Sequence, residues 1–170
     1  MSSHAADAGK VGEKTPGRIV LGWWGRRLGR DDGRSRALAA RLRRAGPVDA
    51  LAEPEVHEFA RSLGLRDAER LARLVTLLAE VRTHVPQTLA RRLGGTAPKL
   101  SHLRFQRLMR ASGDELTDAL RRAIIMADRS CNVAALGVDL LDWSERTRGN
   151  WCFHYFGAEA PEDDSGETTQ

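Results

Sequence analysis

The sequence predicts an all-α fold, a compact helical bundle of about eight helices. Two observations lead to this prediction. Apolar residues recur at the i, i+3, i+4 and i+7 spacing of an amphipathic helix in one window after another. No window shows sustained alternation of apolar and polar residues bounded by hairpin turns, apart from the ambiguous WCFHYF near the end.

The first two helices are predicted from their start and stop signals. Pro16 suits the first turn of a helix, because the N–H that proline lacks has no partner there. The adjacent rings of Trp23-Trp24 point two ways around this helix, so we expect one to be buried and the other partly exposed. Asp31 or Asp32 caps the second helix, which ends at Gly46-Pro47.

Two helices and a turn are expected in the middle of the chain. One helix begins near Glu53-Pro54 and stops at Gly64, since glycine readily takes the left-handed conformation that ends helices. Asp67 caps the next helix, whose apolar residues fit the helical template best. Thr88–Leu93 is expected to be a short basic turn before the break at Gly94-Gly95.

Residues 100–122 separate apolar faces from arginine faces. Ser101 is expected to cap a helix whose buried side holds Phe105 and Leu108. At about 100° per residue, a separate face of this helix holds three arginines, Arg104, Arg107 and Arg110. Ser112-Gly113 breaks the helix, Asp114 caps the next one, and Arg121-Arg122 lie beside its apolar stripe.

The last two helical segments are rich in apolar and aromatic residues. Asn132 is expected to cap the first of them, and the second covers residues 144–156. Exposed aromatic rings could stack on single-stranded bases. We instead expect the aromatic residues of this region to be core, because large rings at helical spacing usually fasten a terminal helix to a domain: Trp143, Trp151, Phe153, Tyr155 and Phe156.

Composition divides the chain into three parts. Residues 1–15 are small and polar, and residues 158–170 form an acidic tail, so both are expected to be disordered extensions. Residues 16–157 are expected to form a single helical domain, with a division into two sub-bundles near 94–99 as an alternative. The tail holds five acids and no base, so the net charge of +4 understates how basic the rest of the chain is.

The motifs of known catalytic and metal sites are missing from the sequence. It has no GxSxG, no phosphate-binding loop, no dinucleotide fingerprint and no paired histidines of a zinc site. Asp31-Asp32 is better explained as a cap than as a metal ligand pair, and Cys152 as a structural cysteine than as a nucleophile. We therefore expect no catalytic residues, no metal and no cofactor. We expect a cytoplasmic protein with no membrane partner, because the sequence has no apolar run long enough to cross a bilayer.

An ordered series of segments resembles the CasB family, the small subunit of the type I-E CRISPR Cascade complex. The series runs from the Trp23-Trp24 helix through ALAARLRRA and LRFQRLMRA to ELTDALRRAI, NVAALGVDLLDW and WCFHYFG. Each segment alone is a common amphipathic pattern, and their order makes the resemblance specific. It covers most of residues 18–157 and is densest over 100–157.

This resemblance implies a non-catalytic helical subunit that holds nucleic acid. The partners implied are the backbone and large subunits of Cascade, a second copy of the chain packed head to tail, the guide RNA, and the target and displaced DNA strands. The arginines that match the family segments are Arg43, Arg44, Arg104, Arg107, Arg110, Arg121 and Arg122. Four basic residues that need not align with functional ones form a second group: Arg26, Arg27, Arg146 and Arg148.

Two other functional classes remain open on the sequence. A DNA-binding regulator would insert a helix into the major groove, but the arginine helices here are separated by capped breaks and lack an Asn/Gln reading set. In a helical adaptor that binds only protein, the arginine faces would pair with acidic partners. Arginine contacts to phosphates do not distinguish one nucleic-acid sequence from another. A complex whose specificity comes from a guide RNA requires contacts of this kind.

Overall fold

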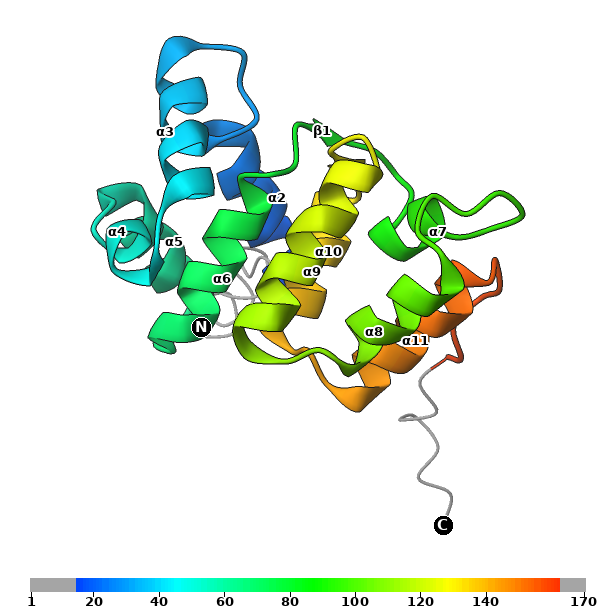
Figure 1. Cartoon of the computed structure of the whole chain (residues 1–170). Helices are drawn as coiled ribbons and strands as arrows, with labels where there is room; N and C mark the ends of the chain where they lie inside the picture. Colours follow the sequence, from blue (N-terminus) through cyan, green and yellow to red (C-terminus); the bar gives the residue numbers. More distant parts are fainter. Residues whose placement is uncertain (1–14, 163–170) are drawn as a thin grey trace, which may run out of the picture.

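Ten helices and one pair of very short strands make up the regular structure of residues 15–162, the part of the chain that the computed structural model describes (Figure 1). The helices that begin before residue 90 are α2 (Pro16–Arg27), α3 (Gly33–Arg44), α4 (Pro47–Leu51), α5 (Pro54–Leu63), α6 (Ala68–Leu78) and α7 (Leu89–Leu93). Those after it are α8 (His102–Arg110), α9 (Gly113–Met126), α10 (Val133–Leu141) and α11 (Glu145–Tyr155). The all-α prediction is confirmed.

Most of the predicted helix ends are correct because short polar side chains satisfy the first free N–H groups. Asp32, Asp67, Ser101 and Asn132 each accept a hydrogen bond from a backbone N–H of the first turn. Gly64 ends α5 with a φ of 65°. One predicted cap is wrong: Ser112 occupies the N-cap of α9, and Asp114 lies in its first turn, where its charge favours the positive end of the helix dipole.

Two short helices and a pair of very short strands were not predicted. α4 is a five-residue helix, and α7 replaces the basic turn expected at Thr88–Leu93, with Thr88 accepting from the Arg91 N–H. β1 (Thr83–His84) and β2 (Ser130–Cys131) pair in parallel. These strands tie the segment after α6 to the segment after α9, and two residues are too short a run to show alternation in a sequence.

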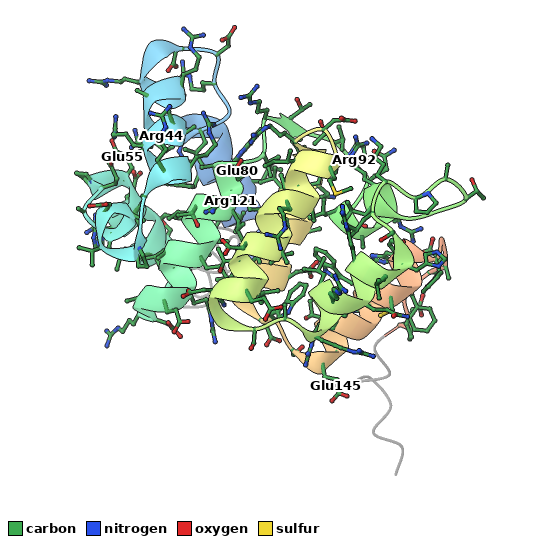
Figure 2. All side chains as sticks on the ribbon, viewed as in Figure 1. Arg44, Glu55, Glu80, Arg92, Arg121 and Glu145 are labelled. Carbon is green, nitrogen blue, oxygen red and sulfur yellow. The ribbon has the colours of Figure 1, made fainter. Side chains whose placement is uncertain are left out.

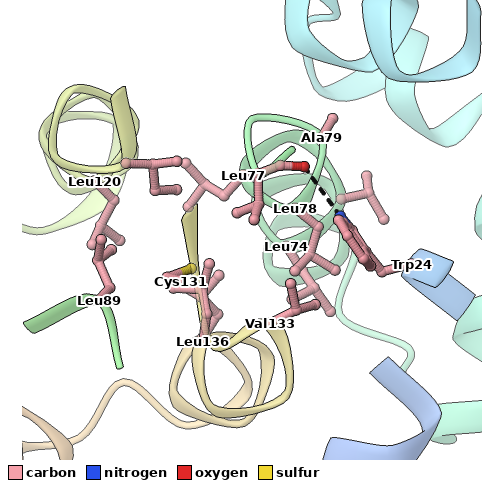
Figure 3. Packing of buried hydrophobic residues seen from close by; sticks show 14 of the residues in the cluster. Trp24, Leu74, Leu77, Leu78, Ala79, Leu89, Leu120, Cys131, Val133 and Leu136 are labelled. Atoms are coloured by element: carbon pink, nitrogen blue, oxygen red, sulfur yellow. Dashed lines mark hydrogen bonds between the residues drawn. The ribbon is translucent and has the colours of Figure 1, made fainter. Parts of the chain in front are cut away.

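One continuous hydrophobic cluster fills the interior and joins elements from both halves of the chain. α2 packs along α10, and α10 also contacts α6. The close approach of α2 and α10 requires Gly137, because a Cβ at this position would lie 2.3 Å from a Val20 methyl carbon. Figure 3 shows the part of the cluster where Leu74 and Leu78 of α6 face Val133 and Leu136 of α10.

Both rings of the tryptophan pair are buried, so the prediction of one partly exposed ring was wrong. Trp23 stacks on Phe59 of α5 with ring centroids 4.3 Å apart. Trp24 donates its indole N–H to the Val81 carbonyl at 3.2 Å and packs beside Leu78 (Figure 3). The sequence did not show that α2 contacts both α5 and the segment that follows α6.

The aromatic ending is only partly core. Trp151 and Tyr155 are buried, Tyr155 stacks on Phe105 with centroids 3.9 Å apart, and Trp143 is half-buried. The core prediction was wrong for Phe153 and Phe156, which are exposed. WCFHYF is therefore helical with two faces, one against α8 and one against solvent.

The predicted domain limits remain predictions. Buried residues on both sides of 94–99 belong to the same cluster, and Gly94 lies so close to α11 that a Cβ would overlap the Tyr155 carbonyl oxygen. Of the predicted extensions, residues 1–14 and 163–170 lie outside the described part of the chain. Within the described part, no helix is long and apolar enough to span a membrane.

Candidate nucleic-acid interface

Arginines from α8 and α9 come together along one groove. Arg104 and Arg107 of α8 and Arg122 of α9 line a hollow of about 390 Å³ whose apolar floor includes Leu108 and Met126. The Ser101 cap fixes the start of α8, and the burial of Phe105 and Leu108 turns the arginine face outward. We call this hollow the α8–α9 groove. Each of these three arginines was predicted from the sequence as a contact residue. The sequence did not predict that α8 and α9 bring them into one groove.

The groove arginines have no acidic partner in the part of the chain that the structure describes. Arg104, Arg107 and Arg122 are exposed, and within residues 15–162 no ion pair or hydrogen bond engages their guanidinium groups. The acid that lines the groove with them is Glu115. Guanidinium groups that already point into a shared hollow, without a partner to displace, are well placed to bind anions.

Arg110 follows Arg107 by three residues at the end of α8; it is exposed but does not line the groove. No described side chain pairs with it. Beside it, Arg148 of α11 donates to the Met109 carbonyl at 3.2 Å and is half-buried. Arg148 therefore closes the carbonyl end of α8, whereas Arg110 is free to meet a ligand.

Arg121 has a different environment from its neighbour Arg122, although both were predicted to contact nucleic acid. Its Nε lies 3.4 Å from Oε1 of Glu80, which is 3% exposed, and a terminal nitrogen lies 3.6 Å from Asp118. Figure 2 shows Arg121 beside Glu80 at the centre of the molecule. Glu80 also accepts a hydrogen bond from Arg129. Arg121 is thus part of an internal arginine–glutamate cluster that links α6 to α9.

Arg43 and Arg44 divide in the same way. Arg43 is half-buried and donates to the Ala79 carbonyl at 3.2 Å, and burial lowers the pKa of its guanidinium. Arg44 is exposed, with no ion pair to the described residues. Neither residue lines the α8–α9 groove.

A second basic groove lies between α2 and α3. It has a volume of about 640 Å³, and Arg26 and Arg27 line it. Three arginines that were not among the predicted site residues line it as well: Arg30, Arg34 and Arg41. Their signal was present in the sequence, because Arg34 and Arg41 lie away from the apolar face of α3.

Acids neutralise much of this second groove. Arg27 pairs with Glu58 at 2.7 Å, Arg41 with Glu53 at 2.7 Å, and Arg30 with Asp32 at 3.1 Å. Arg26 is exposed, as is Arg146 near the start of α11. The α8–α9 groove therefore offers the greater concentration of unpaired charge.

The aspartates Asp31 and Asp32 and the two cysteines lie in separate local environments. Asp32 caps α3 with a 2.8 Å bond from the Ser35 N–H, and Asp31 pairs with Arg36. Burial raises the pKa of the Cys131 thiol to about 12, and Cys152 is half-buried. Among residues 15–162, no three histidine, cysteine or acidic side chains are grouped as metal ligands.

A family model and a relative that match this chain carry the same family description. A family model described as CRISPR-associated protein Cse2 matches residues 38–156, which include all the helices from the middle of α3 through α11. A protein of Thermus thermophilus named "CRISPR-associated protein Cse2" is 30% identical over 161 residues, covering 88% of this chain and 95% of that protein. No solved structure matches the chain.

Proposed function

The chain belongs to the CRISPR-associated Cse2 family, the CasB small subunits of type I-E Cascade, and from this premise we propose that it is a non-catalytic subunit that holds nucleic-acid phosphates in its α8–α9 groove. As a Cascade subunit it works beside other subunits. The contacts we propose are with the backbone and large subunits and with a second copy of the chain, head to tail. The nucleic acids we propose are the guide RNA, the target strand and the displaced strand of the R-loop.

The observation that carries this proposal is the meeting of Arg104, Arg107 and Arg122 in one groove without acidic partners among residues 15–162. An ion-paired arginine has to give up its carboxylate before it can bind a phosphate. These three arginines have no such carboxylate to give up among residues 15–162. Arg110 and Arg44 are exposed in the same unpaired way and extend the proposed contact set. Arg43, Arg121 and Arg148 support the fold through their internal partners.

Phosphate contacts suit this function because they are indifferent to sequence. Pairing between the guide and the target strand supplies specificity in RNA-guided recognition, and R-loop formation is close to balanced in free energy. A few arginine contacts to a displaced strand are therefore enough to shift that balance. Since binding by such contacts releases counterions, it weakens steeply as salt increases.

The test compares two triple variants with the same loss of charge. One replaces the groove residues, Arg104→Gln, Arg107→Gln and Arg122→Gln. The control replaces three exposed arginines outside the groove, Arg18→Gln, Arg61→Gln and Arg66→Gln. Affinity for fluorescein-labelled single-stranded DNA of two unrelated sequences is measured by anisotropy over a range of salt concentrations.

We expect the groove variant to flatten the log–log salt dependence by about 2, since each single-strand phosphate contact contributes about 0.7. The effect should be the same for both DNA sequences. The control variant should change the slope little, because its arginines do not line the groove. Equal slopes for the two triple variants, or an effect confined to one DNA sequence, would show that the groove is not the phosphate site.

A further inference from the structure

We propose that the acidic segment 158–170 of this chain binds in cis to the α8–α9 groove and competes there with nucleic acid. The competition rests on the function proposed above, whereas the contact itself does not. The segment carries five acids and no base: Glu159, Glu162, Asp163, Asp164 and Glu167. Carboxylates and phosphates are alternative anionic partners for arginine.

The first residues of this segment are held in a defined place. α11 ends at Tyr155. Two residues later, Gly157 has a φ of 77°, and the Ala158 N–H donates to the Phe153 carbonyl at 2.8 Å. Arg91 of α7 then holds both the Ala158 carbonyl, at 3.1 Å, and the Glu159 carboxylate, at 3.2 Å. The segment therefore leaves the helical body from a fixed point beside α7.

This point lies at one end of the α8–α9 groove. The ring of Phe156, just before the turn, lies 5.5 Å from the ring of His102 at the start of α8. Tyr155 donates its hydroxyl hydrogen to the carbonyl of Leu100, and Leu100 lines the groove. The segment and the groove thus share the junction of α11 with the start of α8 (Figure 1).

The segment is long enough to follow the groove. Residues 163–170 can extend about 26 Å at roughly 3.3 Å per residue. The nine residues of α8 span only about 13 Å at 1.5 Å per residue. The acids beyond the Arg91 contact can therefore meet arginines along the full length of α8.

Charge favours the α8–α9 groove over the α2–α3 groove. Acids of the helical body already pair with Arg27, Arg30 and Arg41 in the α2–α3 groove. Arg104 and Arg107 have no such partner among the described residues. The segment therefore gains more in the groove where it does not have to displace another carboxylate.

Tethering makes weak contacts effective. A short linker gives an effective concentration on the order of millimolar. If the free segment binds the groove with a Kd of about 0.1 mM, the tethered segment reduces the affinity of nucleic acid roughly tenfold. Such a competitor suppresses binding to stray nucleic acid, while a ligand that makes many phosphate contacts still displaces it.

The experiment uses full-length variants. The tail variant carries Asp163→Asn, Asp164→Asn and Glu167→Gln, and it keeps the Arg91 contact intact. A control with the same change in net charge carries Asp49→Asn, Asp142→Asn and Glu145→Gln, three exposed acids outside the groove. Affinity for fluorescein-labelled oligothymidylate at low salt is measured for both and for the unmodified chain. The arginine Nε–H resonances are recorded by NMR without nucleic acid.

We expect the tail variant to bind oligothymidylate several-fold to about tenfold more tightly than the unmodified chain, and the control less than twofold more tightly. The resonances of Arg104, Arg107 and Arg122 should differ between the tail variant and the unmodified chain. This difference should persist on tenfold dilution. Unchanged resonances overturn the inference, and a difference that disappears on dilution overturns contact in cis.

The two proposals fail in different ways. If the groove arginines are needed for DNA binding but the tail variant changes neither affinity nor resonances, the tail inference is wrong and the proposed function stands. If the resonances shift but no variant binds oligothymidylate, the tail contact is supported and phosphate binding in the groove is refuted.

Discussion

Replacing Glu80 with glutamine removes a negative charge that two arginines share in the interior. Glu80, two residues after α6, is 3% exposed and lies 3.4 Å from Nε of Arg121 on α9. Its other oxygen accepts a hydrogen bond from Arg129, which follows α9. Glu80→Gln preserves the shape of the side chain, so the variant isolates the loss of charge.

The loss of stability caused by Glu80→Gln depends on how far water reaches the two arginines. Removing one partner of a fully buried ion pair costs about 3–5 kcal/mol. The side chains of Arg121 and Arg129 are 31% and 26% exposed, so water partly solvates them once Glu80 is neutral. We therefore expect a loss of about 2–3 kcal/mol in the free energy of unfolding. For a chain of this length, that corresponds to a fall in Tm of roughly 5–10 °C.

Urea unfolding followed by far-UV circular dichroism at neutral pH measures this loss. Asp118→Asn is the matched control, because Asp118 also approaches Arg121, at 3.6 Å, but is 60% exposed. This exposed pair should contribute less than about 0.5 kcal/mol. If Glu80→Gln proves no more destabilising than Asp118→Asn, the internal cluster does not stabilise the fold as argued.

Two further predictions concern α10. Gly137→Ala should lower the free energy of unfolding by about 1–3 kcal/mol, measured in urea, because its Cβ would lie 2.3 Å from a Val20 methyl carbon and force α2 away. Burial raises the pKa of Asp139 to about 6, so the folded chain keeps a proton that the unfolded chain releases near pH 4. Stability should therefore fall as the pH rises from 4 through 6, and Asp139→Asn should flatten that part of the stability–pH profile relative to the unmodified chain.

The helices were predictable because local chemistry determines their ends. The Asp67 and Ser101 side chains satisfy N–H groups only three residues away, and Gly64 adopts its left-handed conformation without a distant contact. Such signals lie within a few letters of sequence. The burial of Trp24 could not be foreseen, since it depends on a carbonyl 57 residues away.

The candidate site was predictable only to the level of a helix face. Helical periodicity correctly separated the arginines of α8 from its core residues. It could not show that Arg122 joins Arg104 and Arg107 in one groove, because that depends on how α8 and α9 pack. It also could not separate arginines with internal partners, such as Arg43, from exposed ones.

Arg121 and Arg122 show how the fold and the proposed site depend on each other. Neighbouring residues on a helix point about 100° apart, so α9 presents Arg121 to Glu80 and Arg122 to the groove. The contact of Arg121 with Glu80 limits rotation of α9 about its own axis, and that rotation sets the direction of Arg122. If the groove binds phosphates as proposed, the buried carboxylate has two opposed effects on that binding. Its charge lowers the positive potential, while its contact with Arg121 holds α9 in the orientation that turns Arg122 toward the groove.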